Sequence, residues 1–354
     1  MISGSERGVS VGVVTWNSRP HVRECLAAVE GDRAAGSPIE DVVVVDNAST
    51  DRTPEILARE HPSVRVVRNE RNLGFAAAAN RAVRETRGAH LLLLNPDCRI
   101  GAGYVGTLLE ALKAAKGRYG AAGGKLLRPR RESSPGNDTI DSAGLELTLA
   151  LRVRDRGQGE PDRGRYDADE EVFGLCAAAA LFSREFLDDV TLRTGEVFDE
   201  TFGSYKEDAD LAWRGRRLGW RSLYVAGAVA EHRRGFAAER RSDVPAWIRR
   251  QSFRNRYLLL LKNATLGDVV SRLPFLLASE FGLLSYAVAR DRSLLPAYAD
   301  ALGLAPSALA KRRGREARGA RAPADSSPRA ARAAAPRDPN AAGGAVAVRG
   351  GKTD

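Results

Sequence analysis

Asp97 follows a run of four leucines and is the first residue of this sequence placed to do chemistry. Leu91–Leu94 is typical of a short strand buried on both faces, and Pro96 must end it because proline cannot donate to a sheet ladder. A carboxylate is thereby set at the carboxyl end of a parallel strand, the edge at which α/β sheets bind ligands. We interpret Asp97 as a ligand for a divalent cation that carries a diphosphate. The alternative is an aspartate that only caps the turn after the strand.

A second group of carboxylates lies between residues 198 and 210. Five acidic side chains fall within these thirteen residues, and three of them stand where a helix is predicted to begin: Glu207, Asp208 and Asp210. The backbone N–H groups at a helix start favour negative charge, which explains one or two of these residues but not obviously all three. A solvated acidic face is the alternative interpretation.

The N-terminal half of the chain has the pattern of the sheet that would place these carboxylates. Apolar segments rich in valine and leucine alternate with segments of helical periodicity. The predicted strands are Val9–Thr15, Asp41–Val45, Val64–Val67 and the leucine strand, and the last helix between them is Ala76–Arg87. This order predicts an α/β fold with a mostly parallel, doubly wound sheet flanked by helices.

The second half of the chain is less regular. We expect these elements: helix Gly101–Ala115, strand Ala121–Leu127, a hairpin within Asp138–Arg154, a mobile loop Arg154–Glu171, helix Glu207–Leu218, and short strands Trp220–Val225 and Ala228–Glu231. A basic helix over Pro245–Leu261 and an apolar stretch over Leu266–Ala289 follow. These two segments either lie on an anionic membrane face, or pack on the catalytic domain or in a dimer.

The charge of the chain is concentrated at its C-terminus. Residues 311–354 hold 11 of the Lys and Arg residues but only 4 of the acidic ones, and so account for +7 of the net charge of +10. This segment lacks hydrophobic periodicity and is predicted to be a disordered basic tail. Because it has no interleaved aromatic residues, we expect no specific nucleic-acid partner.

Six short motifs occur in a fixed order along the chain and are followed by His232. They are Val13-Val14-Thr15-Trp16-Asn17-Ser18, Val44-Val45-Asp46-Asn47-Ala48-Ser49-Thr50-Asp51, Asn72-Leu73-Gly74-Phe75, Leu94-Asn95-Pro96-Asp97, Phe198-Asp199-Glu200 and Glu207-Asp208-Ala209-Asp210-Leu211. In this order they resemble glycosyltransferase family 2, in particular its rhamnosyltransferase-like bacterial branch. The resemblance covers roughly residues 9–262.

The resemblance implies a GT-A fold and inverting transfer of a sugar, plausibly rhamnose, from a nucleotide-diphosphate sugar. The donor would be dTDP-rhamnose or a UDP-sugar, and the acceptor a glycan or a lipid-linked glycan. Asp46 would accept a hydrogen bond from the base. The other residues expected at the nucleotide sugar are Thr15, Asn17, Asn72, Gly74 and Asn95.

The resemblance also assigns the metal ligands and the base. Asp97 matches the last position of the Asp-x-Asp metal motif of the family, whereas its first position is the neutral Asn95, which holds a hard cation such as Mg²⁺ or Mn²⁺ less strongly than a carboxylate does. His232 would be a second ligand. Asp208 matches the catalytic base. Its neighbours Glu207 and Asp210 would either raise its pKa or bind acceptor hydroxyls.

The boundaries that follow are a GT-A catalytic domain over 1–240, a C-terminal helical segment over 241–310 and the tail over 311–354. Within the first, residues 9–127 would bind the nucleotide sugar and 128–240 the acceptor. We expect a cytoplasmic protein, in peripheral contact with the inner membrane face if the acceptor is lipid-linked, because the N-terminus lacks a signal-peptide pattern and the three cysteines are scattered. A nucleotidyltransferase and a non-catalytic sugar-nucleotide-binding or scaffold protein are the alternative functions.

Overall fold

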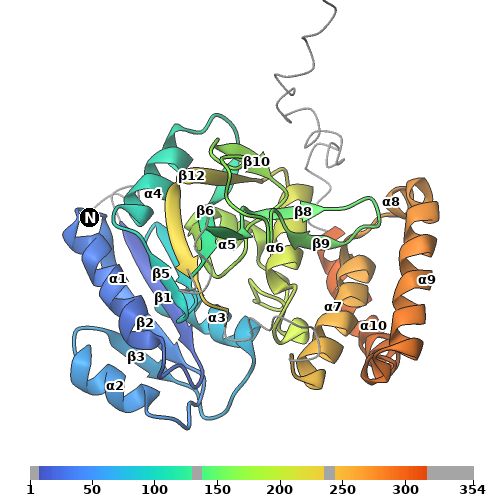
Figure 1. Cartoon of the computed structure of the whole chain (residues 1–354), viewed down its shortest axis with the longest axis horizontal. Helices are drawn as coiled ribbons and strands as arrows, with labels where there is room; N and C mark the ends of the chain where they lie inside the picture. The colour runs from blue at the N-terminus through green and yellow to red at the C-terminus, as the bar shows by residue number, and fades with distance from the viewer. Residues whose placement is uncertain (1–7, 130–137, 235–243, 317–354) are drawn as a thin grey trace, which may run out of the picture.

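The computed structural model describes residues 8–129, 138–234 and 244–316 (Figure 1). The strands are β1 (Val9–Thr15), β2 (Ile39–Asp46), β3 (Arg65–Arg68), β4 (His90–Leu94), β5 (Cys98–Ile100), β6 (Tyr119–Arg128), β7 (Thr139–Ser142), β8 (Leu145–Leu147), β9 (Val153–Asp155), β10 (Glu170–Val172), β11 (Ala179–Ser183) and β12 (Arg221–His232). The helices are α1 (Val22–Ala34), α2 (Thr53–Glu60), α3 (Phe75–Glu85), α4 (Tyr104–Ala114), α5 (Arg184–Val190), α6 (Glu207–Arg217), α7 (Ala246–Asn263), α8 (Leu266–Ser271), α9 (Leu273–Ala289) and α10 (Pro296–Glu316), with short 3₁₀ turns η1 (Glu200–Phe202) and η3 (Arg292–Leu294).

The central sheet has the strand order β10-β12-β6-β11-β4-β1-β2-β3. Six of these eight strands run in one direction, and β11 and β10 run against them. The predicted α/β fold with a mostly parallel sheet is therefore confirmed. Its parallel strands end together at one edge, which is where the candidate chemistry lies.

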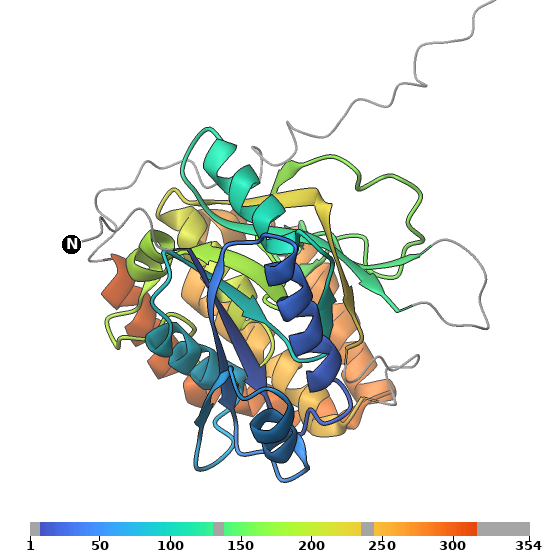
Figure 2. The ribbon, with the colours of Figure 1, turned by 90° about the vertical axis from the view of Figure 1, so that its left-hand side faces the viewer.

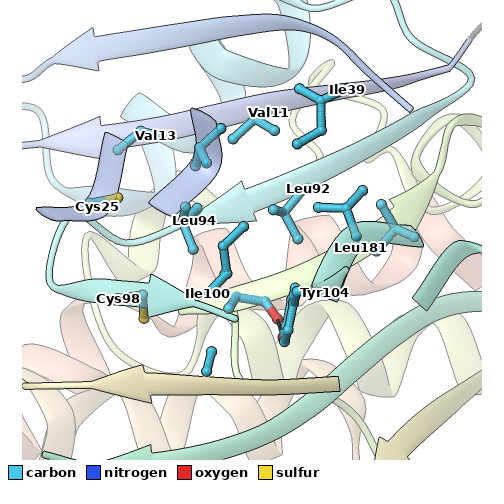
Figure 3. Packing of buried hydrophobic residues seen from close by; sticks show 14 of the residues in the cluster. Val11, Val13, Cys25, Ile39, Leu92, Leu94, Cys98, Ile100, Tyr104 and Leu181 are labelled. Atoms are coloured by element: carbon cyan, nitrogen blue, oxygen red, sulfur yellow. Dashed lines mark hydrogen bonds between the residues drawn. The ribbon is translucent and has the colours of Figure 1, made fainter. Parts of the chain in front are cut away.

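Helices cover both faces of the sheet (Figure 2). On one face α1 and α4 pack on the strands, and Figure 3 shows Val11, Leu92, Leu94 and Tyr104 within this layer. On the other face α3, α5 and α6 bury a second cluster that includes Leu91, Leu93 and a group of α3 alanines. The leucine strand β4 is thus buried on both sides, as its sequence predicted.

Several boundaries differ from the expected ones. The two strands expected before His232 are a single long strand, β12, which has a register shift between Val225 and Val229 where it pairs with β6. The helix expected to begin at Gly101 begins at Tyr104 instead, because residues 101–103 form a turn. The segment expected as a mobile loop, 154–171, is held by hydrogen bonds to β7 and ends in β10.

Part of the segment expected as a disordered tail is helical. Helix α10 continues through residue 316, and Lys311 lies 2.8 Å from Glu196 and pairs with Asp199. The remainder of the predicted tail, 317–354, lies outside the described residues.

The basic helix α7 packs against the protein along much of its length, although Trp247 near its start is 56% exposed. Its arginines pair with acidic residues that follow it in the chain: Arg249 with Asp291, Arg250 with Asp300 and Arg256 with Glu280. Of the two alternatives for this helix, packing on the protein is therefore what is observed. None of the helices within the described residues is both long enough and apolar enough to cross a membrane.

Candidate active site

The carboxyl ends of β1 and β2 place Thr15 directly opposite Asp46. The Asp46 carboxylate is fully buried and accepts hydrogen bonds from the Thr15 hydroxyl and the Ser49 backbone amide, each at 3.2 Å. Arg68 Nε lies 3.3 Å from the same carboxylate. The structure thus brings together two of the residues expected at a nucleotide, with a guanidinium group beside them.

Asn17 connects the loops that follow β1 and β2. Its side-chain oxygen accepts hydrogen bonds from the backbone amides of Thr50 (2.8 Å) and Asp51 (3.3 Å). Its φ angle of 49° lies in the left-handed region, which asparagine tolerates better than most residues do. Asn17 therefore shapes the rim of the expected nucleotide site through its backbone and its loop contacts.

Asn47, which sequence reasoning did not select, organises the loop that contains Asn72 and Gly74. Its amide nitrogen donates to Asn72 Oδ1 (2.8 Å) and to the Gly74 carbonyl (3.2 Å), and its oxygen accepts from the Leu73 amide (3.1 Å). The signal that could have found it is its position directly after Asp46, in the same polar turn.

Gly74 lies where the nucleotide loop touches the loop before α6. Its φ is 84°, and a Cβ atom there would lie 2.9 Å from the Gly203 carbonyl oxygen, so a larger residue would be both strained and obstructed. Across this contact the Ala76 amide donates to Gly203 O at 2.8 Å and the Phe75 amide to Ser204 Oγ at 3.2 Å. The expected nucleotide and catalytic segments are therefore packed against each other.

Asp97 and His232 meet between the ends of β4 and β12. His232 Nε2 lies 3.4 Å from Asp97 Oδ1, and Nδ1 on the other side of the ring lies 2.8 Å from Asp141 Oδ2. Burial favours the neutral ring, but the hydrogen bonds to Asp141 and Asp97 outweigh it and raise the pKa of His232 to about 9. The structure thus joins the two predicted metal ligands and adds Asp141, a residue that the sequence did not single out.

These residues fit a divalent cation. Metal-binding histidines usually present one ring nitrogen to the ion while a carboxylate holds the other, which is the role that Asp141 has here. Asn95 Oδ1 is a buried oxygen without a hydrogen-bond partner among the described residues. Cys98 lies in the same group, but Mg²⁺ and Mn²⁺ prefer oxygen ligands to a soft thiolate. Asp97 and His232 would hold the ion.

Arg234 connects this group to a further carboxylate, Asp155. Its Nε donates to Asp141 Oδ1 and a terminal nitrogen donates to Asp155 Oδ2, both at 2.7 Å. The other oxygen of Asp155 is buried and has no hydrogen-bond partner among the described residues. Neither residue was predicted, because Asp155 comes from a hairpin and Arg234 from the end of β12, and nothing in the sequence connects them.

Glu207 and Asp208 open helix α6 after a strained turn. Tyr205 and Lys206 have φ angles of 70° and 74°, a conformation that costs about 1–3 kcal/mol at each residue other than glycine. Burial, offset by Lys206 and reinforced by Asp155, raises the pKa of Asp208. Strain of this kind persists only where the surrounding structure enforces it. Here the strained turn directly precedes the carboxyl groups of Glu207 and Asp208.

Glu207 is the more perturbed of the two. Its side chain is buried, and its Oε2 atom lacks a hydrogen-bond partner among the described residues. Burial and the charge of Asp208 raise the pKa of Glu207 to about 8. The charge of Asp208 thus acts on Glu207, whereas the expected effect of Glu207 on the pKa of Asp208 and its acceptor-binding role stay predictions.

Asp210 points away from this group. It is fully buried, and its carboxylate accepts hydrogen bonds from Arg214, Lys262 and Asn263, each at 2.8 Å. These cations keep its pKa below the usual value despite burial. The expectation that Asp210 binds acceptor hydroxyls finds no support in this position, because its oxygens are occupied in joining α6 to α7.

The carboxyl groups near Asp97 and those near Asp208 lie close enough to shift the pKa values of the same neighbouring side chains. Glu207 and Asp97 both add to the effect of burial in raising the pKa of Tyr205, and Asp155 and Asp208 do the same for the thiol of Cys176. A hollow of about 490 Å³ lies elsewhere, at the amino ends of β2 and β3, where Arg65 and Glu85 pair with each other. We therefore take the carboxyl edge of the sheet as the candidate active site.

Residues 10–191, more than half of the chain, match the family model described as Glycosyl transferase family 2. The chain belongs to this family. It is a glycosyltransferase, and the expectations of family, fold and enzyme class are confirmed. The site residues and their individual roles stay predictions.

Two curated relatives agree with this assignment. N-acetylglucosaminyl-diphospho-decaprenol L-rhamnosyltransferase of Mycobacterium tuberculosis is 28% identical over 247 residues, which cover 65% of this chain and 77% of the relative. N-acetylglucosaminyltransferase of Azorhizobium caulinodans is 28% identical over 232 residues, which cover 63% of this chain and 54% of the relative.

The solved structures with a similar fold are glycosyltransferases of the GT-A type. TarS 1–349 of S. aureus superposes with a TM-score of 0.53 at 17% identity, covering 85% of this chain and 81% of TarS. GalNAc-T7, crystallised with UDP, GalNAc and Mn²⁺, gives a TM-score of 0.51 at 14% identity, covering 72% of this glycosyltransferase and 48% of GalNAc-T7. At these identities the likeness concerns the fold.

The contact between Asp141 and His232 generates a test of the metal ligands. We expect Asp141→Asn to weaken Mn²⁺ binding about 10- to 100-fold, because the ring of His232 loses the carboxylate that orients it. Calorimetric titration with MnCl₂ measures the affinity, and circular dichroism checks that the variant is folded. The matched control is Cys98→Ser, which should leave the affinity unchanged. Equal Mn²⁺ affinity in Asp141→Asn and wild type would contradict the orienting role.

The raised pKa of Glu207 predicts the pH dependence of stability. The folded chain retains a proton on Glu207 up to about pH 8, whereas the unfolded chain loses it near the ordinary value of 4.5. The free energy of unfolding should therefore fall as the pH rises between these values. Glu207→Gln should lessen this fall, measured by urea unfolding across the range. Glu185→Gln, at the exposed first turn of α5, is the control and should behave like wild type. Parallel curves for Glu207→Gln and wild type would refute the assignment.

Proposed function

We propose that this glycosyltransferase moves a sugar from a nucleotide-diphosphate sugar to a hydroxyl of a glycan or lipid-linked glycan, with inversion at the anomeric carbon. The observation that carries the proposal is the position of Asp208 near Asp155, whose partner Arg234 connects through Asp141 to the pair Asp97 and His232. An ion site and a carboxyl group suited to proton transfer thus share one edge of the sheet.

Asp208 is the general base of the proposed reaction. It takes the proton from the acceptor hydroxyl while that oxygen forms a bond to the anomeric carbon and the bond from this carbon to the diphosphate oxygen breaks. A carboxyl with a raised pKa suits this role, because a base works best when its pKa approaches the working pH. One displacement without a covalent intermediate gives inversion.

Asp97 and His232 hold the divalent cation, with Asn95 next to them. When bound, Mg²⁺ or Mn²⁺ neutralises charge that develops on the leaving diphosphate. Support comes from the carboxylate behind His232 and from the unsatisfied oxygen of Asn95. The Mn²⁺ in the GalNAc-T7 structure is consistent with this use of a cation.

The nucleoside of the donor lies against Asp46, Thr15 and Asn17, with the loop of Asn72 and Gly74 closing the other side. Asp46 retains acceptor capacity, because a carboxylate offers about four lone-pair positions. Arg68, close to Asp46 and largely exposed, would face the nucleotide as well. Asp46 would accept a hydrogen bond from the ring N–H of thymine or uracil, and this contact says nothing about the sugar of the donor.

Rhamnose is the sugar we favour, and a lipid-linked glycan the acceptor. The support is the mycobacterial relative, which is described as a rhamnosyltransferase acting on a decaprenol-linked N-acetylglucosamine. A UDP-sugar is the second candidate donor, supported by a structure of TarS 1–349 with UDP-GlcNAc. The family assignment gives no support to the nucleotidyltransferase alternative, and the carboxyl groups collected at the site argue against a non-catalytic scaffold.

The role of Asp208 is tested by Asp208→Asn. We expect transfer to fall about 10²- to 10⁴-fold because the amide cannot accept the proton of the attacking hydroxyl. The measurement is nucleoside diphosphate release in the presence of an acceptor, with and without Mn²⁺. Thermal shift with nucleotide and Mn²⁺ serves as the control, since binding should survive. Wild-type transfer rates in the variant would remove Asp208 from the mechanism.

The donor class is tested by melting the protein with dTDP, UDP or GDP in the presence of Mn²⁺. A nucleotide at 100 times its Kd stabilises the folded chain by about 2.7 kcal/mol, which raises the Tm by several degrees. We expect dTDP or UDP to raise the Tm and GDP to leave it unchanged. A response to GDP alone would exclude a pyrimidine donor.

A further inference from the structure

Helices α8 and α9 expose a set of large apolar side chains, which we call the outer face. Helix α9 forms the right-hand edge of the molecule in Figure 1, on the side away from the sheet. The exposed apolar side chains are Leu266 and Val270 of α8 and Leu273, Phe275, Leu277, Phe281, Leu284 and Val288 of α9. Leu266 and Phe281 are 77% and 76% exposed, so these are fully presented side chains.

The opposite side of α9 is apolar too. Leu276 and Leu283 pack towards α7 and α10, and Ala287 is fully buried there. Glu280, the single charged residue of α9, also points inward, to Arg256 (2.7 Å). A helix that is apolar all round is normally enclosed on all sides, and a patch of this extent normally marks a surface that binds something.

The charges next to the outer face are basic. Arg290 and Arg292 follow α9 and are exposed, and neither makes an ion pair with any described residue. Every acidic side chain in residues 264–313 is paired with an arginine. The pairs are Asp268–Arg217, Glu280–Arg256, Asp291–Arg249 and Asp300–Arg250. The outer face therefore has a positive border and no unpaired acidic group to balance it.

The basic border favours an anionic partner over a second copy of the chain. If two copies of the chain met through the outer face, Arg290 and Arg292 of one copy would face an equally basic border without an acid to pair with. An anionic phospholipid surface complements both features, because acyl chains accept the apolar side chains and headgroups accept the arginines. We propose that the outer face binds the surface of an anionic bilayer, with α9 lying in the plane of the interface.

The outer face is also connected to the active site. Leu147 and Val153 of the β8–β9 hairpin pack in one cluster with Val269 of α8, and the turn of the hairpin exposes Leu149. The same hairpin ends in Asp155, the carboxylate held by Arg234. Resting on the proposed function, this contact holds the acceptor side of the site close to a membrane in which a lipid-linked glycan is embedded.

Sedimentation of the full-length chain with lipid vesicles tests the proposal. The protein should bind phosphatidylcholine vesicles that contain phosphatidylglycerol, and bind pure phosphatidylcholine more weakly. The double variant Leu277→Ser/Phe281→Ser should bind at least about tenfold more weakly, since it removes two apolar side chains that would enter the bilayer. Arg290→Ala/Arg292→Ala should lose about fivefold per arginine, and this loss should shrink at high salt.

Two controls separate this proposal from the proposed function. Val66→Ser, an exposed apolar residue on β3 at the other end of the molecule, should bind vesicles like wild type, and so should Asp208→Asn. The Leu277→Ser/Phe281→Ser variant should keep its thermal shift with nucleotide and Mn²⁺. Unchanged vesicle binding by that variant would overturn the proposal. So would a wild-type dimer in light scattering that this variant converts to a monomer, because the outer face would then join two copies.

Discussion

The buried carboxylate of Asp141 is the constraint on which the active site depends. It lies on β7, fully enclosed, and a carboxylate in that position requires positive partners because an unpaired buried charge is strongly destabilising. It contacts His232, the last residue of β12, and Arg234, which lies two residues further along the chain. Asp141 thus orients the His232 ring towards Asp97 and the Arg234 guanidinium group towards Asp155.

Strand β6 makes these contacts of Asp141 possible. It pairs with β12 along one side and with β7 along the other, so residues far apart in sequence meet at the carboxyl edge of the sheet. The register places Leu126 beside both Ala230 and Ser142. The contacts of Asp141 are therefore set largely by sheet pairing.

The strained turn before α6 needs a separate support, and α7 provides it. Asn255, fully buried, donates to the backbone carbonyls of Phe202, Ser204 and Tyr205. Lys262 of the same helix pairs with Asp199 and Asp210, and so fixes both ends of the segment that carries Asp208. The C-terminal helices are in this sense part of the active site. Several of their polar side chains point inward, whereas many apolar side chains of α8 and α9 are exposed.

The sequence alone determined the parallel sheet, the position of Asp97 at its edge and the family, because these depend on short-range patterns of apolar strands and ordered motifs. The family resemblance assigned Thr15 and Asp46 to one nucleotide site, and the structure brings them together because the parallel strands β1 and β2 end side by side. Tertiary structure decided which carboxylates share the site. Asp210 and Asp208 are two residues apart on one helix, yet helical rotation turns the first towards Lys262 and the second towards Asp155. Asp141 and Arg234 were beyond prediction, because only the pairing of β6 with two distant strands brings their opposite charges into contact.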